Sequence, residues 1–396
     1  MNLLHLESSG SWGGQEYRTC LEINWLNANG HRAWLICDPT SEVMTKAREL
    51  GTPVVPMSLK HRINPLVSFR IWLFCRRNRV DLIKTYSSKD HWLCLPLYLC
   101  GWPVTRSRCI TDPLGHKKRA FIYRHGCAKI VADAQVIKKE FIEQYGITGK
   151  KIEVIGSAVD LEKFSPNRDR MKFRREVGLS EETPIIVNIG MIRPDKGQFN
   201  LVEAARIVRH QRPDAHFVFV GEATGGRSRE KWVRKAIDRA GLNGNVLMMG
   251  YRWDIPDILA AANMVVIASR HTEASPIVLR EAFASGRPVV ATRVGDVPEI
   301  IVHGENGLIV QPNDSNALAT AILLFLSDEN LAARCAANGL RYAREHFCFD
   351  RMMRAKLDVD VALVEASKKR RVRPTESSET PELPPIASPV TRLTTR

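Results

Sequence analysis

Met264-Val-Val-Ile-Ala-Ser-Arg-His-Thr-Glu273-Ala-Ser-Pro-Ile-Val-Leu-Arg-Glu281-Ala-Phe-Ala-Ser-Gly-Arg-Pro-Val-Val290 is the stretch of sequence that decides the fold. An apolar run is followed by a polar loop, by a helical pattern that starts near Ser275-Pro276, and by a second apolar run. Two buried strands joined by one helix form a parallel β-α-β unit. The carboxylates of Glu273 and Glu281 can then face the carboxyl end of the sheet, where open α/β folds bind ligands. The alternative is a loop acid and a solvated helix acid with no shared role.

The same alternation of apolar runs and helical patterns extends along the whole chain and predicts parallel α/β units throughout. In the first half we expect strands near residues 2–7, 32–37, 53–55, 80–84, 104–109, 128–132 and 152–155. In the second half we expect them near residues 184–190, 215–221, 245–249, 264–268, 288–291 and 307–310. This doubled pattern predicts an α/β fold with two Rossmann-like domains. Their boundary falls near residues 164–169, where apolar residues become fewer and turn-forming residues cluster.

Positive charge gathers in one part of the chain. The formal net charge is +15, and residues 60–124 hold 14 Lys and Arg against 3 Asp and Glu. This concentration implies an anionic partner, such as a phospholipid surface, a lipid-linked phosphate, an acidic glycan or a nucleic acid. The segments 66–79 and 116–124 mix apolar with basic residues, which suits either an interfacial helix or a packed helix with solvated charges. We expect docking to an anionic membrane through residues 60–124, and no nucleic-acid partner, because no nucleic-acid module is recognisable.

Cysteine usage and apolar runs bear on the compartment. The nine cysteines form no Cys-x-x-Cys pair, which favours a reducing cytoplasm over a disulfide framework. The sequence opens directly on an apolar strand pattern, so we expect no signal peptide. The longest apolar run, Trp92 to Trp102, is only 11 residues long and contains Pro96, which is too short to span a bilayer. We therefore expect a cytoplasmic protein, at most peripheral on the inner face of the plasma membrane.

Three glycine-containing loops follow predicted strands. Gly190-Met-Ile-Arg193-Pro-Asp-Lys196-Gly197 opens a helix near Gln198, and its two cations at a helix N-terminus suit a diphosphate. The alternative there is an exposed turn with solvated charges. Gly13 and Gly14 follow the first predicted strand, where backbone N–H groups can meet a phosphate or sugar. Gly295 precedes Asp296 and Glu299 after a later strand, beside the helix of Glu281 if the strand order is sequential.

Together these features resemble the retaining nucleotide-sugar glycosyltransferases of family 4 (glycosyl transferases group 1), which have the GT-B fold. The resemblance covers about residues 1–350 and is strongest over 184–310. Segments 154–164 and 250–259 also look like the interdomain and base-side signatures of that family. It implies two Rossmann-like domains facing across a cleft: an N-terminal acceptor-side domain over residues 1–165 and a donor domain over 166–345. A helix over 346–366 would cross back to the first domain, and the polar tail 367–396 is expected to be disordered.

The resemblance also implies roles for individual residues. Arg193 and Lys196 would hold the donor diphosphate and stabilise its departure, and Glu273 would contact hydroxyls of the donor sugar. The other donor-binding residues implied are Gly13, Gly14, Gly190, Tyr251, Arg252, Glu281 and Gly295, with Glu281 on the ribose and Tyr251 and Arg252 near the base. The co-substrate would be a nucleotide sugar, with UDP ahead of GDP, and the acceptor a glycan or a lipid-linked glycan. No cofactor and no metal are expected, because two side-chain cations supply the charge.

The sequence departs from the family pattern on the acceptor side. Cys109 stands where a His is frequent, and a thiol is a weaker polar contact than an imidazole. The nearby candidates for acceptor contacts are His91, Asp112 and His116, each of which also has a structural or solvated alternative. Asp296 replaces a frequent glycine, and Ala134-Gln135 stands where Ser-Glu is common. These departures leave two further hypotheses open beside a transferase: a nucleotide-sugar epimerase of GT-B architecture and a non-catalytic sugar-nucleotide-binding protein.

Overall fold

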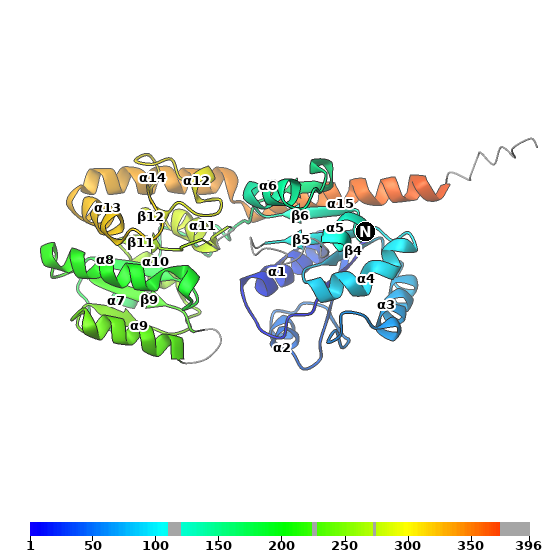
Figure 1. Cartoon of the computed structure of the whole chain (residues 1–396), viewed down its shortest axis with the longest axis horizontal. Coiled ribbons are helices and arrows are strands. Elements are labelled where there is room, and N and C mark those ends of the chain that lie inside the picture. The colour runs from blue at the N-terminus through cyan, green and yellow to red at the C-terminus, as the bar shows by residue number, and fades with distance from the viewer. Residues whose placement is uncertain (110–119, 224–227, 272–274, 373–396) are drawn as a thin grey trace, which may run out of the picture.

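The computed structural model describes residues 1–109, 120–223, 228–271 and 275–372, which form two lobes (Figure 1). The N-terminal lobe holds a seven-stranded sheet in the order β3-β2-β1-β4-β5-β6-β7, and the C-terminal lobe a six-stranded sheet in the order β10-β9-β8-β11-β12-β13. Neighbouring strands in both sheets are paired in parallel. The prediction of an α/β protein with two Rossmann-like domains is confirmed.

The strands lie within one or two residues of the predicted positions. In the first sheet they are β1 (Asn2–Glu7), β2 (Arg32–Cys37), β3 (Val54–Pro56), β4 (Leu82–Thr85), β5 (Val104–Arg108), β6 (Lys129–Ala132) and β7 (Ile152–Val154). In the second they are β8 (Ile185–Ile189), β9 (His216–Val220), β10 (Val246–Met248), β11 (Met264–Ile267), β12 (Val289–Thr292) and β13 (Leu308–Val310). The strand order reverses between β1 and β4 and between β8 and β11, and such switch points are where open parallel sheets bind ligands.

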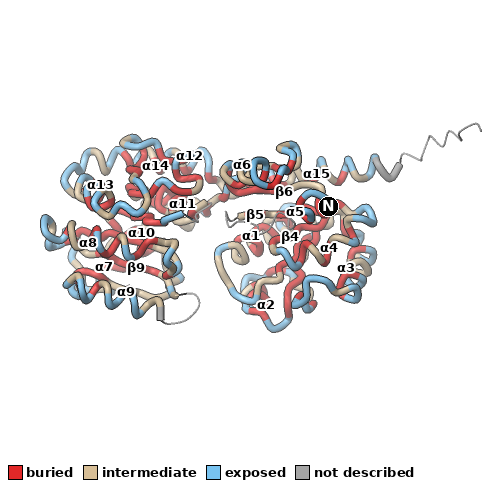
Figure 2. Tube along the Cα trace, in the orientation of Figure 1, coloured by how far each residue is buried: buried red, intermediate tan, exposed pale blue. Residues whose placement is uncertain are grey.

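Helices cover both faces of each sheet (Figures 1 and 2). The N-terminal lobe contains α1 (Gly14–Ala28), α2 (Glu42–Glu49), α3 (Pro65–Arg77), α4 (Ser88–Leu99), α5 (Ala120–His125) and α6 (Gln135–Glu143). The C-terminal lobe contains α7 (Met171–Val177), α8 (Gln198–Gln211), α9 (Ser228–Arg239), α10 (Ile255–Ala261), α11 (Ile277–Ala284), α12 (Val297–Ile300), α13 (Ser315–Ser327) and α14 (Glu329–His346). Several helices begin at capping residues that the sequence supplies, because a side-chain oxygen there accepts from a free backbone N–H. Asn64, for example, accepts from the N–H of Val67 at the start of α3.

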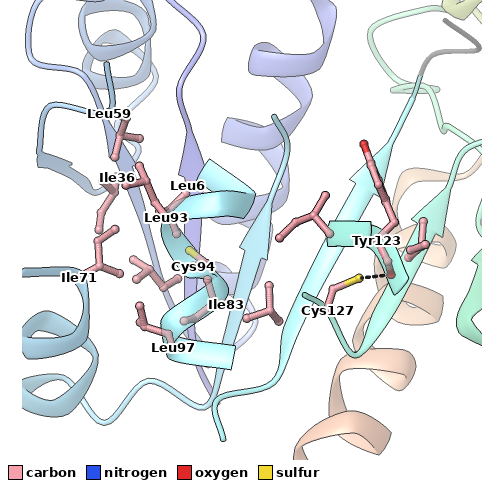
Figure 3. Close-up of a cluster of buried hydrophobic side chains, with 14 of the residues drawn as sticks. Leu6, Ile36, Leu59, Ile71, Ile83, Leu93, Cys94, Leu97, Tyr123 and Cys127 are labelled. Atoms are coloured by element: carbon pink, nitrogen blue, oxygen red, sulfur yellow. Dashed lines mark hydrogen bonds between the residues drawn. The ribbon is translucent and has the colours of Figure 1, made fainter. Parts of the chain in front are cut away.

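The apolar runs form the cores between sheets and helices. In the N-terminal lobe, strand residues such as Leu6 and Ile83 pack against Leu93 and Cys94 of α4 (Figure 3). Cys94 and Cys127 are fully buried there, and burial raises the pKa of the Cys127 thiol to about 11. These cysteines therefore serve as small apolar side chains.

The last helix, α15 (Phe349–Val372), returns to the N-terminal lobe and runs along it (Figure 1). Lys84 Nζ lies 2.5 Å from Asp360 Oδ2, and Lys356 forms a buried ion pair with Glu22 of α1. Trp25 Nε1 donates to Asp350 Oδ1 at 3.0 Å. The expectation that residues 367–396 are disordered is wrong for 367–372, which continue the helix. The reason is local, because Ala366 to Arg371 contain no helix-breaking residue.

Candidate active site

Three loops of the second sheet lie side by side at its carboxyl edge. Backbone hydrogen bonds join the loop after β8 to the loop after β9, from Gly190 N to Val220 O and from Ile192 N to Glu222 O, both at 2.9 Å. A further bond from Gly221 N to Gly250 O, at 2.8 Å, adds the loop after β10. A Cβ on Gly221 would lie 2.1 Å from the carbonyl oxygen of Gly190, so only glycine allows this approach. The sequence Gly190–Gly197 is thereby held at the switch point between β8 and β11.

Gly197 fixes this loop against the end of β11. Its φ is +70°, and a Cβ there would lie 1.9 Å from the carbonyl oxygen of Ala268. The backbone N–H of Arg270 donates to the carbonyl oxygen of Asp195 at 2.7 Å, which ties the same two segments together a second time. The short helix over Pro194–Lys196 and the start of α8 therefore have one defined position relative to β11.

The two predicted diphosphate ligands differ in their surroundings. Arg193 donates from Nε and Nη2 to the two carboxylate oxygens of Asp195, both at 2.8 Å. This bidentate pair neutralises the Arg193 guanidinium within its own loop, so Arg193 must turn from Asp195 to grip a phosphate with the same donors. Lys196 follows directly, and its N–H donates to Arg193 O at 3.0 Å. Asp195 was not identified from the sequence as a residue that competes with phosphate for Arg193, although it stands between the two cations.

Glu281 lies just over one turn into α11, on the helix that opens after the β11 loop. Burial raises the pKa of its carboxyl to about 7, and Lys163 partly offsets the rise. The helix start reaches the other lobe, because a Cβ on Gly14 would lie 3.7 Å from Ile277 Cδ1. Gly13 and Gly14 therefore sit opposite the first turn of α11, and Glu281 follows one turn behind it.

An aromatic pair borders the loop after β10. Tyr251 and Trp253 are both exposed, and their rings meet edge to face with centroids 4.9 Å apart. Lys46 of α2, in the other lobe, lies 5.3 Å from the Trp253 ring centroid. Arg252 points elsewhere: it donates to Glu176 and Asp254 with four contacts of 2.6 to 2.8 Å. The Tyr251 ring is thus exposed beside Trp253, whereas Arg252 is held by ion pairs to Glu176 and Asp254.

Arg280 contacts both segments that cross between the lobes, and it was not identified from the sequence. It is buried and donates from Nη2 to Asp296 Oδ2 at 2.6 Å and from Nε to the carbonyl oxygen of Ser157 at 2.8 Å. Its guanidinium carbon also lies 4.9 Å from the Phe347 ring centroid. Ser157 and Phe347 belong to the two segments that cross between the lobes, so one side chain contacts both crossings. Asp296 in place of a frequent glycine, together with Arg280 in a mostly apolar helix, was the signal that could have found this pair.

The acceptor side differs most from the prediction. Cys109 accepts from Arg18 Nη2 at 2.7 Å, and Arg18 Nη1 donates to Asp133 Oδ2 at 2.7 Å and to Ser157 Oγ at 2.5 Å. Burial raises the pKa of Cys109 to about 12 against the effect of Arg18, so the sulfur remains a thiol. Cys109 is thus part of a buried cluster that reaches the first crossing between the lobes.

His91 is not available to an acceptor, so that prediction is wrong. It lies in the core of the N-terminal lobe, fully buried, with its ring edge to face against Tyr123 at 5.5 Å. Burial and the nearby Arg106 lower its pKa to about 3, so it is neutral. The predictions for Glu273, Asp112 and His116 fall outside the described residues.

A pocket of about 540 Å³ lies between the lobes, where α6 faces α12. Gln135, Lys138 and Ile142 line it from α6, Pro298 and Glu299 from α12, and Gly295 from the loop before α12. Burial and the neighbouring Asp296 raise the pKa of Glu299, while a hydrogen bond from the backbone of Gln135 lowers it. Gly295 therefore borders an open pocket that both lobes line.

Two absences hold for the described part of the chain. No three His, Cys, Asp or Glu side chains gather there into a group suited to a metal ion. Asp358 and Asp360 have the spacing of an Asp-x-Asp pair, but Asp360 is buried against Lys84. Within the same residues, no helix is both long and apolar enough to cross a bilayer.

These lobes and loops define a doubly wound, two-domain α/β protein whose candidate ligand site lies at the facing carboxyl edges of two parallel sheets. Two family models match it: "Glycosyltransferase Family 4" over residues 12–163 and "Glycosyl transferases group 1" over residues 169–342. The chain belongs to the group 1, family 4 glycosyltransferases, which have the GT-B fold.

Solved structures share the arrangement of both lobes. An Anabaena protein, Alr3699/HepE in complex with UDP, superposes with a TM-score of 0.82 at 23% identity and covers 91% of this chain and 100% of its own. A glycosyltransferase from Rickettsia africae superposes with a TM-score of 0.83 at 22% identity, over 92% of this chain and 98% of its own. At these identities the likeness is one of fold.

Characterised relatives match over part of their length. The lipopolysaccharide core biosynthesis mannosyltransferase LpsB of Rhizobium meliloti is 31% identical over 205 residues, which is 51% of this chain and 58% of the relative. A D-inositol 3-phosphate glycosyltransferase of Corynebacterium glutamicum is 27% identical over 221 residues, 54% of this chain and 53% of the relative. The chain thus spans little more than half the length of these relatives.

Proposed function

We propose that this protein is a retaining glycosyltransferase that moves a sugar from a nucleoside diphosphate sugar to a glycan or glycolipid of the cell envelope. The observation that carries the proposal is the convergence at one sheet edge: the Gly190–Gly197 loop, the start of α11 with Glu281, and the Tyr251 loop. Gly14 faces α11 from the other lobe, since a Cβ added to it would lie 3.7 Å from Ile277 Cδ1, and Gly13 directly precedes it. A cationic glycine loop, a carboxylate for hydroxyl groups and an aromatic face together fit the three parts of a nucleotide diphosphate.

In the proposed reaction the anomeric C–O bond to the diphosphate breaks, and its electron pair leaves with the phosphate oxygen. Lys196, together with Arg193 once it has turned from Asp195, stabilises the charge that grows there, as cations do in a water-poor site. The acceptor hydroxyl bonds to the anomeric carbon on the same face, and its proton passes to the departing phosphate oxygen. The residues Lys196, Arg193 and Glu273 form the proposed catalytic set, and the reaction uses no metal.

For the donor we propose UDP-sugar ahead of GDP-sugar. In this proposal Glu281 accepts hydrogen bonds from the ribose hydroxyls, Tyr251 stacks on the base, and Gly190 and Gly295 admit the diphosphate and sugar. The Anabaena structure that shares the fold is a complex with UDP, which supports this order. Because LpsB is a lipopolysaccharide core enzyme by name, an envelope glycan or its lipid-linked precursor is the favoured acceptor. The protein would work at the cytoplasmic face of the membrane, attached peripherally.

The test is equilibrium titration of UDP and GDP against the full chain, followed by product analysis with a panel of UDP-sugars. Lys196→Ala and Glu281→Gln should each weaken UDP binding at least about tenfold, since each removes a charged hydrogen bond to the ligand. Lys231→Ala, on the exposed face of α9, is the matched control and should bind as wild type. Wild-type affinity in both site variants would refute the assignment.

Product analysis separates the alternatives. Slow release of UDP and free sugar without acceptor, and glycosylated product with acceptor, support a transferase. An epimerised nucleotide sugar formed without acceptor would instead identify an epimerase. Donor binding without any turnover across the acceptor panel would identify a binding protein.

A further inference from the structure

The helix α3 carries apolar residues on its solvent side as well as on its buried side. Val67, Ile71 and Cys75 are buried in the core of the N-terminal lobe. Leu66 and Phe69 are 67% and 56% exposed, and Ile63, just before the helix, is 74% exposed. Packing in the core therefore explains one face of α3 and leaves these three large side chains without an explanation.

Cations surround these exposed apolar side chains. Leu66 lies one helical turn from both Phe69 and Arg70, and all three side chains are exposed, so apolar and basic residues neighbour each other on this face. Lys60 and Arg62 before the helix, and Arg76 and Arg79 at its end, are exposed as well. Phe69 stacks on Trp72 at 5.5 Å, and the Arg76 guanidinium lies 5.2 Å from the Trp72 ring. An apolar strip with a basic border is the pattern of a helix that lies in a membrane interface.

The structure shows which cations within residues 60–124 are exposed to solvent. Lys84, Arg106 and Arg108 lie within residues 60–124, but all three are buried in the N-terminal lobe. They cannot attract a partner. Apart from Lys89 and Arg124, the exposed cations described in that region lie in residues 60–79, on and around α3.

A second basic segment, far away in sequence, ends beside this surface. Ser367 Oγ of α15 donates to the carbonyl oxygen of Gly101 at 3.3 Å, next to Leu99, which is 73% exposed. Trp102 Nε1 donates to Val80 O at 3.0 Å and so connects this corner to the end of α3. Lys368 and Lys369 follow Ser367 and are exposed. Figure 1 shows α3 low on the side of the N-terminal lobe that faces away from the C-terminal lobe, and the end of α15 projecting from the top of that lobe in the same direction.

We propose that the outer face of α3 and the end of α15 form one docking surface for an anionic phospholipid bilayer. Ile63, Leu66 and Phe69 enter the interface between headgroups and acyl chains, while Arg70, Arg77, Lys368 and Lys369 bind lipid phosphates. Charge complementarity selects this occupant, because the border of the strip is basic on both the α3 and the α15 side. The inference rests on the proposed function in one respect, that a lipid-linked acceptor would be presented at this surface.

The experiment is co-sedimentation of the full chain with vesicles of phosphatidylcholine containing about one third phosphatidylglycerol, compared with pure phosphatidylcholine. We expect binding to the anionic vesicles, and weaker binding as salt rises, because exposed charges are screened. The double variant Leu66→Ser/Phe69→Ser should bind at least about tenfold more weakly, since burial of a single such side chain is worth that factor. Lys368→Gln/Lys369→Gln should lose roughly a fivefold factor per cation, and only on anionic vesicles.

Two controls on the other lobe match these variants. Val302→Ser/Leu324→Ser removes exposed apolar side chains, and Lys231→Gln/Lys235→Gln removes exposed cations of α9. Both should sediment as wild type. Equal binding by all four double variants, or sedimentation independent of phosphatidylglycerol, would overturn the proposal. Concentration-dependent self-association that Leu66→Ser/Phe69→Ser abolishes, without vesicle binding by the wild type, would assign the surface to a second copy instead.

The two proposals can fail separately. UDP titration should be unchanged in Leu66→Ser/Phe69→Ser, and vesicle binding should be unchanged in Lys196→Ala. If the wild-type protein binds UDP but does not bind anionic vesicles, only the docking proposal is refuted. If the wild-type protein binds anionic vesicles but neither binds nor turns over nucleotide sugars, only the proposed activity is refuted.

Discussion

Replacement of Gly197 by alanine tests how the Gly190–Gly197 loop is held against the sheet. Two costs add at this position. An alanine at φ +70° costs about 1–2 kcal/mol relative to glycine, because its Cβ crowds the following carbonyl. The new Cβ would also lie 1.9 Å from the Ala268 carbonyl oxygen, whereas ordinary contact begins at 3.4 Å, so the end of β11 must move. Forced overpacking of this kind costs about 1–3 kcal/mol, and we expect a total loss of about 2–5 kcal/mol.

Gly178→Ala is the matched control, because it shares the first cost and lacks the second. Gly178 caps α7 in the same lobe with a φ of +71°, and no heavy atom outside its neighbours lies within 4 Å of its Cβ position. We expect it to lose only about 1–2 kcal/mol. The difference between the variants, about 1–3 kcal/mol, then reports the contact with Ala268.

Thermal unfolding of the full chain, with and without UDP, measures both effects. For a domain of this size, 1 kcal/mol lowers the Tm by roughly 2–4 °C, so Gly197→Ala should fall clearly below Gly178→Ala. It should also lose the stabilisation that UDP gives, because Arg193 and Lys196 move with the loop. Equal Tm values for the two variants, or a full UDP shift in Gly197→Ala, would refute the reasoning.

Three further predictions concern buried charges. Because burial raises the pKa of Glu281 to about 7, the free energy of unfolding of the wild type should fall as the pH rises from 4.5 to about 7. Glu281→Gln should lack this fall. Parallel pH profiles of Tm for the two proteins would contradict the prediction. Arg280→Leu and Asp296→Ala should each lower the free energy of unfolding by about 3–5 kcal/mol, because each leaves a buried charge without its partner. The double variant should lose about 1–3 kcal/mol less than the sum of the two. Strict additivity in urea unfolding would show that the pair is not coupled. Lys356 and Arg18 outweigh burial and lower the pKa of Glu22 to about 2, so its contribution is present above pH 4.5 and lost as the pH falls toward 2. Glu22→Gln should cost about 3–5 kcal/mol at pH 7 and progressively less in acid, measured by urea titration at each pH.

The fold was predictable because its signals are local. Each β-α-β unit lies within a few tens of residues, and a run such as Met264–Ile267 is apolar throughout because both faces of its strand are covered. The position of the Gly190–Gly197 loop was predictable for the same reason, since Gly190, Arg193 and Lys196 directly follow one strand; its binding of a diphosphate stays a prediction. The helix end at Val372 was missed because the change in composition after Lys368 was taken as the end of structure, although the basic residues there are good helix formers.

The acceptor side could not be read from the sequence, because its contacts join distant segments. Arg18 meets Cys109 across 91 positions and Ser157 across 139, and no local pattern at any of the three indicates the others. The substitution of a frequent His by Cys109 looked like a loss of function when it was judged alone. In its surroundings the thiol accepts from an Arg that also contacts Asp133 and the first crossing between the lobes. The departure therefore changes how the crossing between the lobes is packed.

The contacts of Arg18 and Cys109 continue through Ser157 into the C-terminal lobe. Two of the departures from the family pattern therefore lie in one series of contacts. Ser157 receives Arg18 on its hydroxyl and Arg280 on its carbonyl oxygen, and Arg280 pairs with Asp296 beside Gly295. Two unusual residues, Cys109 and Asp296, thus contact two buried arginines that share one serine of the crossing segment. A change in the angle between the lobes must disturb these contacts, since they lie where the lobes are joined. Because breaking a buried charge pair is costly, these contacts oppose a change in the angle between the lobes.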